Sequence, residues 1–124
     1  GCESIRVDSM LSRERELRYG DRVELFCSVP GDVVQETGAS KVALAIENHG
    51  VNGNSPSFLL NVLEEVDSEW VGLTLDTANF YWRGYPLSEV YGILKLLALY
   101  ARHTHVKNIA YPEHKREISR DVGW

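Results

Sequence analysis

The sequence has no long hydrophobic run and few cysteines, and each absence excludes a class of protein. Its most apolar stretch, residues 92–101, is short and carries Lys95, whereas a membrane span needs about 20 apolar residues. Cys2 and Cys27 lie far apart without a CxxC pattern, which disfavours a metal–thiolate site and predicts two free thiols in a reducing cytoplasm. Residues 1–4 contain no Met, basic segment or apolar segment, so we expect no signal peptide.

Positive charge is also scarce. The chain carries 13 Lys and Arg against 18 Asp and Glu, a net charge of −5. A nucleic-acid backbone is therefore disfavoured as the main partner, because phosphate binding needs a Lys/Arg surface. A small anionic substrate met by local cations remains compatible with this balance. The 124 residues, 44% of them hydrophobic, suffice for one ordinary core.

Short apolar runs alternate with helical patterns along the chain. Strands are expected over residues 4–8, 41–47, 70–76 and 103–107. Helices are expected over residues 12–37, after the Ser55 cap with Pro56 in the first turn, and after a Ser88 cap. We expect Gly20 and Pro30-Gly31 to interrupt or kink the first helix, Gly38 to cap it, and residues 48–54 to form a loop. Strand–helix repeats of about 30 residues predict βαβ units and a parallel sheet.

Three residues at one spacing favour half of a closed (β/α)8 TIM barrel over an open four-stranded sheet. Glu47, Asp76 and His105 each end a predicted strand, and both intervals are 29 residues (76 − 47 and 105 − 76). They should meet at the carboxyl ends of adjacent strands, where barrel active sites are built. Two carboxylates and an imidazole suit Mn²⁺, Mg²⁺, Co²⁺ or Zn²⁺. The same period predicts a fourth ligand near position 134. Helix caps or loop ties without a metal are the alternative.

Three motifs in this order and spacing resemble the xylose-isomerase-like TIM-barrel superfamily. They are ENHG at 47–50, LDTANF at 75–80 and HTHVK at 103–107. The group includes sugar-phosphate isomerases, sugar 3-epimerases, hydroxypyruvate isomerase, inosose dehydratase and endonuclease IV. The resemblance implies a single partial barrel domain over residues 1–124, covering about strands four to seven and truncated at both ends. It also implies that Glu47, Asp76 and His105 bind a divalent metal, and that a Glu on strand eight, absent here, is the fourth ligand.

The activity implied by the resemblance is a metal-dependent isomerisation or epimerisation of a sugar or sugar phosphate through an enediolate. Glu47 would act as the catalytic base and then as the acid. The expected substrate-binding residues are His49, Asn79, His103 and Lys107; Lys107 shares the strand face of His105. Asn79 stands where the epimerases and endonuclease IV usually carry His. We expect the protein to be cytoplasmic and this segment alone to be inactive.

Other functions remain open at this point. A polyol dehydratase of the inosose type would use the same metal and Lys107, whereas a non-catalytic remnant or binding module would need no metal. A DNA repair nuclease is disfavoured by Asn79 and the negative charge. Arg116 or Arg120 could clamp a phosphate or carboxylate from a loop. The aromatic residues from Phe80 to Tyr85 could wall a sugar ring or pack ordinarily. Open strand edges predict that the isolated chain aggregates, forms a homo-oligomer or packs loosely.

Overall fold

The fold is a four-stranded parallel sheet whose strands follow chain order. A computed structural model describes residues 1–9, 16–110 and 113, with the side chains of residues 30–32 and 35–37 left out of the description. The strands are β1 (Ser4–Asp8), β2 (Ala43–Glu47), β3 (Val71–Asp76) and β4 (Ala101–His105). They pair in the order β1-β2-β3-β4, which confirms the predicted partial (β/α)8 architecture.

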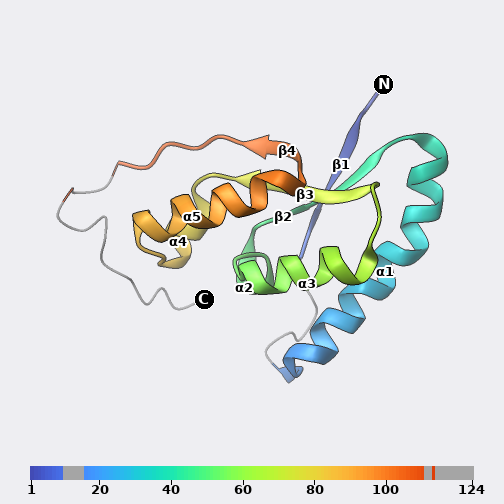
Figure 1. The fold of residues 1–124 in the computed structure, drawn as a ribbon, viewed down its shortest axis with the longest axis horizontal. Helices are drawn as coiled ribbons and strands as arrows, with labels where there is room; N and C mark the ends of the chain where they lie inside the picture. Colours follow the sequence, from blue (N-terminus) through green and yellow to red (C-terminus); the bar gives the residue numbers. More distant parts are fainter. Residues whose placement is uncertain (10–15, 111–112, 114–124) are drawn as a thin grey trace.

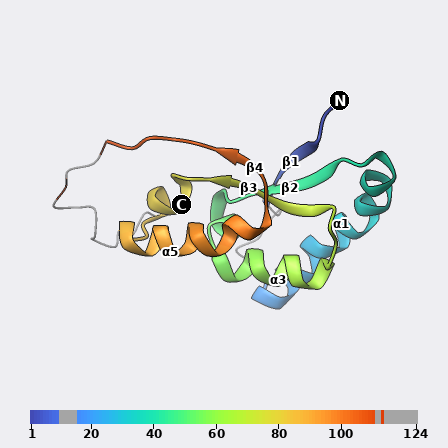
Figure 2. The ribbon, with the colours of Figure 1, turned by 45° about the horizontal axis from the view of Figure 1, so that its top comes forward.

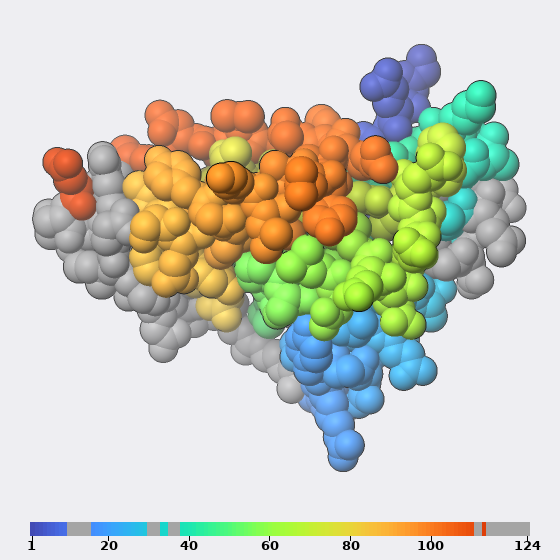
Figure 3. Space-filling view, in the orientation of Figure 1, coloured from blue at the N-terminus to red at the C-terminus, as the bar shows by residue number. Residues whose placement is uncertain are grey.

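Helices connect the strands and cover one side of the sheet. They are α1 (Tyr19–Ser40), α2 (Gly50–Gly53), α3 (Pro56–Val66), α4 (Asn79–Arg83), α5 (Leu87–Leu97) and the short 3₁₀ helix η2 (Ala98–Tyr100). Figures 1 and 2 show α1, α3 and α5 on the same side of the strands. Their outer surfaces form one continuous face of the molecule in Figure 3. Among the described residues, no helix is both long and apolar enough to cross a bilayer.

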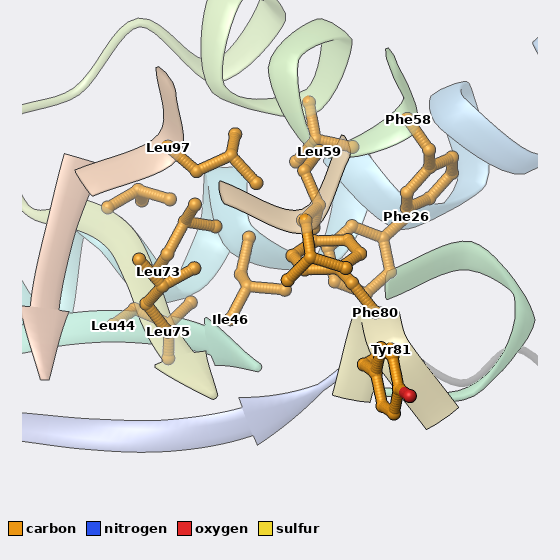
Figure 4. Close-up of a cluster of buried hydrophobic side chains, with 13 residues drawn as sticks. Phe26, Leu44, Ile46, Phe58, Leu59, Leu73, Leu75, Phe80, Tyr81 and Leu97 are labelled. Atoms are coloured by element: carbon orange, nitrogen blue, oxygen red, sulfur yellow. The ribbon is translucent and has the colours of Figure 1, made fainter. Parts of the chain in front are cut away.

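The core lies between the sheet and these helices. Strand residues Leu44, Ile46, Leu73 and Leu75 point toward helix residues such as Leu59 and Leu97 (Figure 4). Every residue of β2 and β3, the two central strands, is buried. Alternation along a strand then sends the side chains of Ala45 and Glu47 to the side away from this core.

The predicted start of α3 is confirmed. Ser55 precedes the helix in an extended conformation, and its side chain accepts a hydrogen bond from the Phe58 amide at 3.4 Å. Pro56 occupies the first turn, where its missing N–H costs nothing. The helix therefore begins at the residue that its sequence signal specifies.

Pro30-Gly31 does not break the first helix, although the axis of α1 changes direction along its length (Figure 1). The backbone of α1 stays helical through Pro30-Gly31 and ends at Ser40, because packing against α3 and β2 outweighs local propensity. Residues 10–15, where we expected its start, lie outside the described residues. Gly38 is not the cap: Lys41 takes the left-handed conformation, with φ of 55°. A Cβ at Gly38 would lie 3.1 Å from Trp70 Cδ1, so the glycine makes room for an indole.

Two connections also differ from the prediction. Residues 48–54 contain the short helix α2 instead of a simple loop. Ser88 does not cap α5, which begins at Leu87 after Pro86, and α4 precedes it. Pro86 fixes the backbone conformation at this start, so the helix needs no Ser cap. Both differences lie in segments that follow the carboxyl ends of strands.

Candidate metal centre

The three side chains predicted as metal ligands converge. Glu47, Asp76 and His105 are the last residues of β2, β3 and β4. One ligand atom of each lies within 4.8 Å of the others. Neighbouring parallel strands end at the same edge of the sheet, so equal sequence spacing becomes spatial proximity. The structure therefore brings together the residues that the spacing singled out.

A β-bulge aligns His105 with Asp76. Leu73 pairs with Ala101, but the next residue, Thr74, pairs with His103, so β4 carries one extra residue. Without the extra residue, Asp76 would face Thr104. Gly72 permits the close approach of β4, because a Cβ there would lie 2.5 Å from the Tyr100 carbonyl oxygen. This irregularity puts an imidazole opposite the carboxylate.

Glu47 is buried and both of its oxygens are engaged. Its side chain is 4% exposed. His105 Nδ1 lies 2.8 Å from Oε1, and Arg6 Nη1 donates to Oε2 at 2.7 Å. No role for Arg6 was predicted from the sequence. The alternation of side chains along a strand places Arg6 on the same face as Asp8, two residues later. Asp8 pairs with Glu47, so the Arg6 side chain lies on the face of the sheet that carries Glu47.

Asp76 is completely buried, and its two oxygens differ. Oδ1 accepts hydrogen bonds from the amides of Ala78 at 2.9 Å and Asn79 at 3.2 Å. Oδ2 has no hydrogen bond of regular geometry among the described residues. It instead faces Lys107 Nζ at 2.5 Å in an ion pair, and His105 Nδ1 at 3.8 Å. One oxygen thus fixes the turn into α4, while the other points into the cluster.

Asn48 holds the two central strands together at the site. Its Nδ2 donates to the Asp76 carbonyl at 3.0 Å, and its Oδ1 accepts from the Asp76 amide at 2.6 Å. His49 was predicted to bind substrate, whereas no role was predicted for Asn48. His49 is not in the metal cluster; its Nδ1 lies 3.8 Å from Asp8 Oδ1. Only tertiary structure reveals that the Asn48 side chain binds a neighbouring strand.

The other predicted substrate-binding residues surround the cluster. Lys107 Nζ lies 3.4 Å from Asn79 Oδ1 and 5.0 Å from the centroid of the Trp82 ring. The exposed His103 ring packs edge-on to His105 with centroids 5.3 Å apart. Phe80 and Tyr81 are buried in the core, so ordinary packing accounts for these two aromatic rings. Arg116 and Arg120 lie outside the described residues.

The cluster fits a divalent cation. Ligand atoms bound to one such ion at about 2.0–2.2 Å lie at most about 4.4 Å apart, so the observed spacing needs only a slight contraction. The buried Oδ2 of Asp76 already attracts the Lys107 ammonium, so this oxygen is placed to bind a cation. Two oxygen donors and one nitrogen suit borderline-hard metals. Arg6 and Lys107 balance the charges of Glu47 and Asp76 from opposite sides of the cluster.

Comparisons with known proteins give the family and the fold. Residues 10–123 match the family model of the xylose isomerase-like TIM barrel. The xylose isomerase domain protein from Planctomyces limnophilus is similar in structure, with a TM-score of 0.65 and 22% identity over 95% of this chain. A D-tagatose 3-epimerase-like protein gives a TM-score of 0.64 and 21% identity over 83% of this chain.

The match covers only part of each relative. This chain spans 40% of the length of both solved structures, in keeping with a portion of a barrel. At these identities the likeness shows the fold alone. A search of curated proteins finds no match. The family model nevertheless covers nearly the whole sequence, and the chain therefore belongs to the xylose isomerase-like TIM-barrel family.

Proposed function

We propose that the protein is a metal-dependent isomerase or epimerase acting on a sugar or sugar phosphate. The observation that carries this proposal is the convergence of Glu47, Asp76 and His105 within 4.8 Å at one sheet edge. A divalent ion held by these three side chains would supply the Lewis acidity that polarises a substrate carbonyl. Family membership supports the same class of reaction.

Glu47 is the proposed catalytic base. It would take the proton from the carbon next to the substrate carbonyl and return it to the same carbon or the next one. Arg6 donates to one of its oxygens and so orients the carboxylate. Because the Glu47 side chain is buried, water has little access to the proton that Glu47 holds between its removal and its return.

The neighbouring polar groups are the proposed substrate contacts. Lys107, with its ammonium between Asp76 and Asn79, is placed to bind a carbonyl or anionic group. Asn79 and His103 would hydrogen-bond sugar hydroxyls near the cluster. His49 would contact a more distant part of the substrate, because it lies beside Asp8.

We further propose that residues 1–124 act as one partial barrel unit that is inactive alone. The described strands supply three ligands, and the solved relatives are much longer. A fourth carboxylate from another strand would complete the coordination, as the 29-residue period predicts. Activity of the isolated chain equal to that of a complete barrel would contradict this part of the proposal.

A polyol dehydratase is the second candidate. The ion pair of Lys107 with Asp76 favours it, because an ammonium group at the site could protonate a leaving hydroxyl. The two reactions leave different products. Dehydration creates a double bond and releases water, whereas isomerisation or epimerisation leaves the elemental composition unchanged.

Deuterium incorporation tests the proposed reaction directly. A barrel containing this segment would be incubated with Mn²⁺ and a panel of ketoses and ketose phosphates in D₂O, and the products examined by NMR and mass spectrometry. We expect a deuteron at the carbon next to the carbonyl without loss of water. Glu47→Gln should abolish incorporation, while Glu64→Gln, at an exposed position of α3, should leave it unchanged. Loss of water would establish the dehydratase, and no reaction across the panel would contradict both enzymatic proposals.

A further inference from the structure

A cavity lies on the helix side of the molecule, apart from the metal cluster. It has a volume of about 470 Å³ and is bounded by the start of α1, the α2–α3 segment and the turn between α4 and α5. Figure 1 shows the start of α1 and the α2–α3 segment below the sheet. None of the metal-cluster residues lines it. Its size is that of a small-molecule site.

Arg22 lines this cavity and carries a donor without a hydrogen-bond partner among the described residues. Its Nη1 donates to Asn52 Oδ1 at 3.0 Å, and its guanidinium lies 5.7 Å from the centroid of the Tyr19 ring. These contacts hold the group in place. The buried Nε atom has no hydrogen-bond partner among the described residues. A buried donor without a partner costs free energy, so the site favours a ligand that brings an acceptor.

Asn54, by contrast, carries an acceptor without a hydrogen-bond partner among the described residues. The residue is 3% exposed, and its Nδ2 donates to the Gly50 carbonyl at 2.9 Å. This bond fixes the orientation of the amide of Asn54, which is one of the residues that line the cavity. Oδ1 is buried and has no partner in the described part of the chain. A ligand that satisfies Asn54 must therefore carry a donor, such as a hydroxyl group.

Charge around the cavity favours an anion. Two arginines, Arg22 and Arg83, and one carboxylate, that of Glu89, line the cavity. Ser55 and the first turn of α3 add the positive end of a helix dipole. Burial raises the pKa of Tyr85, Arg83 opposes the rise and Glu89 adds to it. The Tyr85 phenol thus stays protonated and contributes no negative charge at neutral pH.

We propose that this cavity binds a small hydroxylated oxyanion, a phosphate monoester or a hydroxy acid. The anionic oxygens accept from Arg22 Nε, and the hydroxyl group donates to Asn54 Oδ1. The site is distinct from the metal centre and requires no metal. It goes beyond the proposed isomerase or epimerase activity and does not depend on it.

Calorimetric titration tests the site. The purified protein would be titrated with inorganic phosphate, which carries a P–OH donor, and separately with glycerate. EDTA would remove metal-bound anions, and sodium chloride would keep the ionic strength constant. We expect saturable binding of at least one probe, weakened about tenfold by Arg22→Gln because a charge-assisted hydrogen bond is lost. Lys95→Gln removes the same charge from an exposed position of α5 and should leave the affinity unchanged.

The outcomes separate the sources of the anion. Binding of phosphate alone identifies a phosphate ester as the ligand class, and binding of glycerate alone identifies a hydroxy acid. Circular dichroism would establish that Arg22→Gln is folded; if it is not, Arg83→Gln replaces it with the same expected loss. Absence of saturable binding for both probes, or equal affinities in wild type and the folded variant, would overturn the proposal.

Discussion

The central and edge strands of the sheet contribute to the candidate site in different ways. Every residue of β2 and β3 is buried, whereas β1 and β4 are mostly exposed, with Ile5 at 49%. Glu47 and Asp76 come from the buried pair, and His105 comes from an exposed strand. The carboxylates are therefore held by a rigid interior, while the imidazole rests on an edge.

This difference shows what a buried charge requires. A carboxylate removed from water must be compensated by hydrogen bonds or opposite charge. Glu47 receives this compensation from Arg6 and His105, and Asp76 from two backbone amides and Lys107. Both cations reside on or just beyond the edge strands. The exposed strands and their flanking residues thus supply the positive charges that offset the cost of burying the two carboxylates.

The largest expected effect on stability separates the two kinds of strand. Leu73→Ala opens a cavity in fully buried β3 and should lower the free energy of unfolding by about 2–5 kcal/mol. Ile5→Ala on half-exposed β1 should lower it by less than about 1 kcal/mol. Urea denaturation followed by circular dichroism measures both. Similar losses for the two variants would break the distinction between central and edge strands.

The hydrogen bonds of Asn48 to Asp76 should stabilise the fold measurably, but by less than a large core side chain does. Asn48→Ala leaves the Asp76 amide and carbonyl without these partners. We expect a loss of about 1–3 kcal/mol in the free energy of unfolding, the cost of buried unpaired polar groups. Asn61→Ala is the matched control, because its hydrogen bond to Tyr19 Oη is exposed. It should change stability by about 0.5 kcal/mol at most. An equal effect of the two substitutions would exclude a special role for the bridge.

The two histidines of β4 should differ in metal affinity. His105→Gln removes a proposed ligand and should weaken Mn²⁺ binding about tenfold or more. His103→Gln alters an exposed neighbour outside the ligand cluster and should leave the affinity nearly unchanged. Calorimetric titration with Mn²⁺ measures each. A larger loss of Mn²⁺ affinity in His103→Gln than in His105→Gln would contradict the assignment of His105 as the metal ligand on β4.

The smallest effect concerns the cysteines, both of which are free. Cys2 is exposed before the edge strand β1, whereas Cys27 is partly buried in α1. Burial raises the pKa of the Cys27 thiol, and the nearby Glu65 carboxylate adds to the rise. A smaller thiolate fraction means slower alkylation. Iodoacetamide at pH 7.5 should modify Cys2 first, and the rate at Cys27 should increase as the pH rises. Equal rates at both thiols would contradict this order.

The features set by local sequence were predictable. Apolar runs located the four strands, the Ser55-Pro56 pair located the start of α3, and the 29-residue interval identified three residues that converge. Each signal depends on near neighbours or on a regular period. The strand boundaries differ from the expected ones by a few residues, where hydrogen bonding decides the ends.

The features set by tertiary contacts were not predictable from local patterns. The Trp70 ring occupies the space that a side chain at position 38 would need. The bulge in β4 aligns His105 with Asp76, and the Asn48 side chain hydrogen-bonds the neighbouring strand β3. Each pairs residues that are distant in sequence or depends on strand register. Packing also keeps α1 helical through Pro30-Gly31 against local propensity. Arg6 is the exception, since its strand face was readable and only its partner was missed.

Binding of Mn²⁺ by wild type and by Asp76→Asn tests the central claim most directly. The substitution preserves the size of the side chain and the Oδ1 acceptor for Ala78 and Asn79, and it removes the charge that faces the cluster. We expect one Mn²⁺ per wild-type molecule and an affinity at least about tenfold weaker in the variant. Equal affinity in the two proteins, or no Mn²⁺ binding by folded wild type, would contradict the assignment of Glu47, Asp76 and His105 as a metal centre.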